Sequence, residues 1–162
     1  MIELRDQPVK VAVPMEEPAR NRVDLLAAAQ VHTNRVVLHL EGIDYDQNPG
    51  VNYEVYINLP LGQQPNYQSD YYVGGLGLFG LKPHGHGGQT THAQGQSSGK
   101  RSFDITSHVR ALQARGEWQG RQPEVTFVRS ERRPPANAPA TATGPVRPVI
   151  PARIDQVSIT TE

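Results

Sequence analysis

The stretch PGVNYEVYINLP, residues 49–60, carries the clearest structural signal in the chain. Successive side chains of a β-strand point to opposite faces, so an apolar residue at every second position indicates a strand with one buried face. The alternating apolar residues are Val51, Tyr53, Val55, Ile57 and Leu59. The residues between them are Asn52, Glu54, Tyr56 and Asn58. The stretch is therefore predicted to form a half-buried strand.

Similar patterns recur on both sides of this strand. Strands are predicted within the segments VKVAVP (9–14), RVVLHLEGIDY (35–45), RSFDIT (101–106), PEVTFVRS (123–130) and ARIDQVSITTE (152–162). The last is expected to contain a bulge or start irregularly, because Ile154 is out of phase with Val157 and Ile159. The turn-forming residues DQNPG (46–50) predict a hairpin between the strands on either side of them. The glycines of YYVGGLGLFGL (71–81) predict a bulge or a close backbone approach.

The remaining segments complete the expected architecture. TSHVRALQARGEW (106–118) predicts one short helix, with Thr106 as its N-cap, Val109 and Leu112 on its buried side and Gly116 just beyond its end. Segment 16–34 is expected to be a connection, either a short helix or a surface loop. A His- and Gly-rich loop is expected at 82–100 and a Pro-rich loop at 131–151. We expect one domain over 1–162, all-β: an antiparallel β-sandwich or flattened barrel of about seven strands with one short helix.

Composition excludes several classes of function. The 162 residues include no cysteine, which rules out thiol catalysis, thiolate zinc sites and disulfides. The 16 basic residues balance the 16 acidic ones, so we expect no nucleic-acid partner. No run approaches the roughly 18 apolar residues needed to cross a bilayer. The N-terminus lacks the order of a signal peptide, so we expect a soluble chain with no membrane partner; its compartment is not indicated.

Three sets of short sequence motifs resemble those of one known family. EGIDYDQNPGVNYEVYIN (41–58) is similar to the segment that opens the C-terminal domain of tyrosinases and polyphenol oxidases, where a Gly-Ile pair and a strand ending in Tyr-Ile-Asn recur. VGGLGLFG (73–80), followed after a loop by SFDIT, resembles part of the molluscan haemocyanin units. EVTFVRSERR and ARIDQVSITTE resemble the last two strands of the plant enzymes. Together these motifs resemble the sequence of the C-terminal β-sandwich domain of type-3 copper proteins.

The resemblance implies a non-catalytic domain that packs over the copper-site entrance of a catalytic domain and keeps the oxidase latent. The implied partner is a tyrosinase-like catalytic domain, in the same chain or in a separate one. No cofactor is then expected in this chain, and copper is expected in the catalytic domain. A cover of this kind should present an apolar side chain at a tight turn. The glycine-flanked GLGLFGL offers Phe79 first and Leu81 second, although both are alternatively residues of the domain's own core.

The histidines suggest a second possibility. His84, His86 and His92 lie within the loop at 82–100, and imidazoles two residues apart on a flexible segment can converge on copper or another divalent ion. The plainer interpretation is a solvated loop, because nothing rigid is positioned to orient the rings. If the loop does bind metal, the chain is a free-standing binding partner or a copper-delivery protein for such an oxidase. A small enzyme on the same scaffold would lack a catalytic constellation, so we expect that the chain is not an enzyme by itself.

Overall fold

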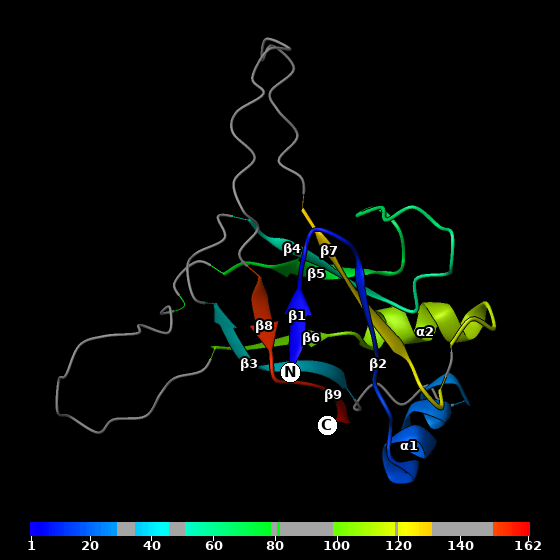
Figure 1. Cartoon of the computed structure of the whole chain (residues 1–162). Helices are drawn as coiled ribbons and strands as arrows, with labels where there is room; N and C mark the ends of the chain where they lie inside the picture. The colour runs from blue at the N-terminus through cyan, green and yellow to red at the C-terminus, as the bar shows by residue number, and fades with distance from the viewer. Residues whose placement is uncertain (29–34, 46–50, 79–80, 82–98, 119, 131–150) are drawn as a thin grey trace, which may run out of the picture.

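Two antiparallel sheets and two helices make up the part of the chain that the computed structural model describes: residues 1–28, 35–45, 51–78, 81, 99–118, 120–130 and 151–162 (Figure 1). The sheets enclose one cluster of buried apolar side chains. Tyr53 connects the sheets within this cluster, because its hydroxyl group donates a hydrogen bond of 3.0 Å to the carbonyl oxygen of Leu4. The predicted all-β sandwich is confirmed.

The first sheet is built around the long strand β3 (Val36–Tyr45). Strand β6 (Gly99–Asp104) pairs with one edge of β3, and β8 (Ala152–Ile154) and β9 (Gln156–Thr161) share the other. Strand β1 (Ile2–Leu4) pairs with β8 and was not predicted, since three residues are too few to show a pattern. The predicted irregularity near Ile154 is confirmed: the last segment is divided at Asp155 into two strands.

The second sheet has the order β2-β7-β4-β5. Its strands are β2 (Val9–Ala12), β7 (Glu124–Arg129), β4 (Tyr53–Ile57) and β5 (Tyr72–Leu76). The register between β4 and β5 shifts between Val55 and Tyr56, which confirms the predicted bulge in the glycine-rich strand. Gly74 also gives the predicted close approach, because a Cβ atom added to it would lie 3.0 Å from the ring of Phe103 on β6.

The predicted hairpin between segments 35–45 and 51–59 is wrong. Strands β3 and β4 belong to different sheets: β3 pairs with β6, β8 and β9, whereas β4 pairs with β5 and β7. The sequence DQNPG indicates a change of chain direction. It contains no information about which strand will pair with the strand that follows the turn. That choice depends on long-range partners distant in the sequence.

Strand β4 is more deeply buried than the alternation predicts. Tyr53, Val55 and Ile57 lie in the core as expected, but Tyr56, on the opposite face, is also fully buried. Its ring packs at 5.5 Å, centroid to centroid, from the ring of Tyr72. The hydroxyl group of Tyr56 donates to Glu54 at 2.6 Å, so the polar end of this amphipathic side chain is satisfied.

The described part of the chain contains two helices where one was expected. Helix α1 (Glu17–Ala28) occupies much of segment 16–34, so the helical alternative for that connection is the correct one. Helix α2 (Thr106–Ala114) buries Val109 and Leu112 as predicted, and Gly116 follows it with φ of 70°. The N-cap position, however, is Ile105 rather than Thr106. No helix among the described residues is sufficiently long and apolar to cross a membrane.

The two predicted loops fall mainly outside the described residues. Residues 82–98 of the His- and Gly-rich loop and 131–150 of the Pro-rich loop belong to that remainder. The boundary at residue 100 is wrong by two residues, because Gly99 and Lys100 begin β6. Gly99 is buried and pairs with Ile43, which gives this end of the loop a fixed place in the first sheet.

Candidate functional site

The segment following β5 contains the two side chains predicted to plug an oxidase. Leu76 and Leu78 are buried in the core. Leu81 is half-buried and packs against the same cluster, and its carbonyl oxygen accepts a hydrogen bond from the hydroxyl group of Tyr45. Phe79 lies outside the described residues. Leu81 is therefore in contact with its own domain, and the choice between the two candidates stays a prediction.

Gly99 fixes the position of Leu81. A Cβ atom at residue 99 would lie 2.5 Å from Cδ2 of Leu81 and 3.1 Å from the carbonyl oxygen of Ile43. Real side chains do not approach so closely, so the leucine rests directly on the backbone of β6. This contact holds the end of the glycine-rich segment over the junction of β3 and β6.

The histidines proposed as metal ligands are not placed by the structure. His84, His86 and His92 all lie outside the described residues. Within the described part of the chain, no group of three His, Asp or Glu side chains is arranged to hold a metal ion. The metal-binding hypothesis for these three residues stays a prediction.

Two described histidines have structural partners. On the exposed face of the first sheet, His39 lies between Ser102 Oγ at 2.9 Å and Thr160 Oγ1 at 2.8 Å, as a cross-strand partner. His108 on α2 donates from Nε2 to the carbonyl oxygen of Tyr72 at 2.8 Å, which fixes its tautomer. Neither ring is paired with a carboxylate in a way that would activate a nucleophile.

The carboxylates of Glu54 and Asp70 also make structural contacts. Glu54 accepts a hydrogen bond from the hydroxyl group of Tyr56, and burial together with this hydrogen bond raises the pKa of the Tyr56 phenol far above its ordinary value. Asp70 pairs with Arg115 at 2.8 Å. The hydrogen bond and the ion pair give each of these two carboxylates a structural partner.

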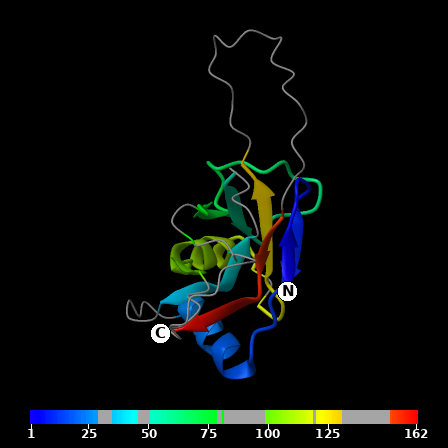
Figure 2. The ribbon, with the colours of Figure 1, turned by 60° about the vertical axis from the view of Figure 1, so that its left-hand side comes forward.

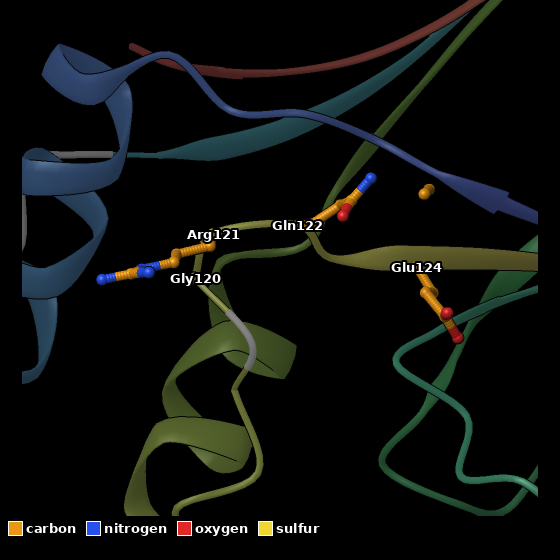
Figure 3. A pocket seen from close by; sticks show the side chains of 5 residues that line it. Gly120, Arg121, Gln122 and Glu124 are labelled. Atoms are coloured by element: carbon orange, nitrogen blue, oxygen red, sulfur yellow. The ribbon is translucent and has the colours of Figure 1, made fainter.

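One hollow of about 360 Å³ opens at the start of β7 (Figure 3). It is lined by Ala12, Gly120, Arg121, Gln122 and Glu124. Figure 3 shows the side chain of Arg121 extending toward α1 and the side chain of Glu124 pointing away from α1. The two charged groups therefore do not converge on one point. The hollow therefore lacks the convergent polar groups of a catalytic or small-molecule site.

Sequence reasoning missed a loop that exposes apolar side chains. The connection from β4 to β5, residues 58–71, contains Leu61 with 89% of its surface exposed and Tyr67 with 66%. Apart from Met1, these are the large apolar side chains that the described part of the chain exposes. A signal was available, because residues 58–69 contain no charged side chain although 20% of the whole sequence is charged.

Comparison with solved structures reveals a related fold in latent polyphenol oxidases. The chain matches recombinantly expressed latent aurone synthase, a polyphenol oxidase, with 17% identity and a TM-score of 0.50 over 99% of this chain and 26% of the other. The same enzyme from its natural source gives the same identity, TM-score and coverage. Latent apple tyrosinase matches with 13% identity and a TM-score of 0.49, over 99% of this chain and 27% of that one. The chain spans about a quarter of the length of these proteins, and at such identities the likeness is one of fold alone.

The sequence was also compared with curated proteins and with protein-family models. No curated protein matches the chain. A family model described as "Domain of unknown function (DUF7868)" matches residues 1–141, which is most of the 162 residues. The chain therefore belongs to this family of unknown function, and its fold is that of a part of the latent polyphenol oxidases.

Proposed function

We propose that this chain is a non-catalytic domain of a tyrosinase-like copper oxidase, and that it covers the copper-site entrance of the catalytic domain and keeps the enzyme latent. The observation that carries the proposal is the match of 99% of this chain to 26% of latent aurone synthase. The rest of that longer chain has no counterpart in this one. The contacts described above, in which histidines and carboxylates have structural partners, are in keeping with a role that requires no chemistry of its own.

The physical basis is local concentration. A cover joined to the oxidase, or held beside it in a complex, faces the entrance at an effective concentration in the millimolar range for a short flexible link. A modest apolar contact is then sufficient to exclude a phenol from the site. Copper would be bound by the catalytic domain, and this chain would supply only the surface that closes the copper-site entrance.

The test compares the catalytic domain encoded with this chain, in the same or a neighbouring reading frame, in the presence and absence of this chain. We expect low catechol turnover with the chain present and a rise of at least about tenfold when it is removed by cleavage or omitted. The isolated chain with added copper should show no turnover above that of free copper ions. Unchanged oxidase activity on removal of the chain would contradict the proposal.

A further inference from the structure

The 58–71 loop combines three features. It has no charged side chain from residue 58 to residue 69, it exposes Leu61 and Tyr67, and it contains Pro60 and Pro65. Single exposed apolar residues are common on protein surfaces and need no explanation. An uncharged segment with a leucine and a tyrosine is different, because the cores of protein interfaces are depleted in charge and enriched in aromatic residues.

The start of the loop is fixed to the second sheet. Asn58 has φ of 49°, a left-handed conformation that asparagine tolerates better than most residues. Its backbone N–H donates to the carbonyl oxygen of Glu124 at 2.7 Å, and its Oδ1 accepts from the N–H of Glu124 at 2.8 Å. One position further on, the carbonyl oxygen of Leu59 accepts from Lys10 Nζ at 3.2 Å. Three hydrogen bonds therefore hold the two residues from which the loop departs.

The end of the loop is fixed to the C-terminus of α2. The hydroxyl group of Tyr71 donates to Glu117 at 2.7 Å, and the guanidinium group of Arg115 lies 5.3 Å from the centre of the Tyr71 ring. Arg115 also pairs with Asp70 at 2.8 Å and with Glu117 at 3.2 Å. The N–H of Ile57 donates to the carbonyl oxygen of Tyr71 at 2.8 Å and closes the base of the loop.

Turns within the loop order its exposed part. The N–H of Gln63 donates to the carbonyl oxygen of Pro60 at 3.2 Å, in a turn that contains Leu61. Asn66 accepts from the N–H of Gln68 at 2.8 Å and from the N–H and hydroxyl group of Ser69 at 3.0 and 2.7 Å, in a turn that contains Tyr67. The loop is drawn in green between β4 and β5 in Figure 1, and Figure 2 shows the same connection after rotation.

We propose that the 58–71 loop is the surface by which this chain docks on its oxidase, with Leu61 and Tyr67 as the two anchoring side chains. The inference rests on the proposed function for the identity of the partner. The occupant is an uncharged, apolar surface of the catalytic domain beside the copper-site entrance. A pre-ordered loop loses little conformational entropy on binding, so less of the free energy gained by burying the two apolar side chains is offset.

The absence of charge in the loop favours a protein surface over other partners. A lipid surface would be met by lysine and arginine beside the apolar groups, and this loop has neither between residues 58 and 69. Tyr67 is of a residue type enriched among the few central anchors that dominate protein interfaces, and Leu61 adds an exposed apolar side chain six positions earlier on the same loop.

The experiment uses the complete oxidase in which this chain is joined to, or mixed with, its catalytic domain. Catechol turnover is measured for the wild type, Leu61→Asp, Tyr67→Asp and the matched control Asn21→Asp, which adds the same charge at an exposed position of α1, outside the loop. We expect Leu61→Asp and Tyr67→Asp to raise basal turnover by at least about tenfold, since each removes an anchor and places a charge in an apolar contact. Asn21→Asp should remain latent. Denaturant midpoints of the four isolated chains should agree, because all three side chains are exposed.

The outcomes separate this inference from the proposed function. If the wild-type chain does not suppress turnover, the proposed function fails and the docking loop fails with it. If the wild type suppresses turnover and both Asp variants suppress it equally, the function stands and the docking loop is wrong. Suppressed turnover in all variants together with a loss of self-association in Leu61→Asp would also overturn the proposal, in favour of contact between two copies of this chain.

Discussion

Gly42 on β3 lies directly beneath the side chain of Asp155, the residue that separates β8 from β9. A Cβ atom added to Gly42 would lie 2.4 Å from Oδ2 of Asp155 and 2.5 Å from its Cβ atom. Gly42 also has φ of 68°, and the N–H of Asp155 donates to the carbonyl oxygen of Glu41 at 3.1 Å. Glycine is therefore required here for its conformation and for the space it leaves. The Gly-Ile pair in the sequence marks the point where one edge of β3 changes partner from β9 to β8.

Gly42→Ala should destabilise the isolated chain by about 2–4 kcal/mol, because alanine adds both left-handed strain and a steric clash. Gly116→Ala is the matched control: its φ is 70°, and nothing lies within 4 Å of the added Cβ atom. The control should lose only about 1–2 kcal/mol through strain. Urea midpoints of the two variants measure the difference. Equal losses would show that Asp155 moves aside at no cost.

Leu81→Asp should destabilise the isolated chain by about 1–3 kcal/mol, because a charge would replace a side chain that packs on the core. Leu61→Asp, at a residue with 89% exposure, should change stability by less than about 0.5 kcal/mol. Phe79→Asp tests the remaining plug candidate in the same assay. A large loss in both the Phe79 and Leu81 variants would eliminate the glycine-rich segment as the plug, whereas an unchanged midpoint for either would retain that residue.

Asp104 should make the chain less stable in acid. Hydrogen bonds from the hydroxyl group and backbone N–H of Thr106 lower the pKa of Asp104, with a smaller contribution from Arg35. A lowered pKa in the folded state stabilises the fold at pH values above the ordinary aspartate pKa of about 3.9, and this contribution is lost as the pH falls through the folded-state value. The stability difference between wild type and Asp104→Asn should therefore shrink from pH 6 to pH 2.5. A difference that stays constant across urea titrations in this range would contradict the argument.

Local pattern was sufficient to predict most strands of this fold, though not the three-residue β1, and it did not predict which strands pair. Val36, Leu38 and Leu40 are all fully buried, as their spacing indicates, because periodicity reports which face of a strand meets the core. The pairing of β3 with β9 instead of β4 was not predictable, since it joins residues more than a hundred positions apart. The full burial of Tyr56 was missed because its ring packs against Tyr72, a residue of the neighbouring strand 16 positions further along the chain.

The candidate site was predicted less well than the fold. Glycines drew attention to GLGLFGL, but Leu76 and Leu78 are core residues, and Leu81 packs against that core. Exposure of Leu61 follows from anchors at the two ends of its loop, and a sequence does not reveal that Tyr71 and Glu117 meet. The absence of charge from residue 58 to residue 69 was the one local signal.

Tyr71 and Glu117 should show a measurable coupling. The hydroxyl group of Tyr71 donates to Glu117 at 2.7 Å, and this hydrogen bond, with some burial, raises the pKa of the tyrosine. A double-mutant cycle with Tyr71→Phe, Glu117→Gln and the combined variant should give a coupling energy of about 0.5–1.5 kcal/mol from urea midpoints. The value should lie toward the lower end, because the Glu117 side chain is 43% exposed and water can replace the lost donor.

Since Glu117 also pairs with Arg115, Glu117→Gln alone should cost more stability than Tyr71→Phe alone if that ion pair contributes. Additive losses within about 0.3 kcal/mol would show that the hydrogen bond does not hold the end of the loop.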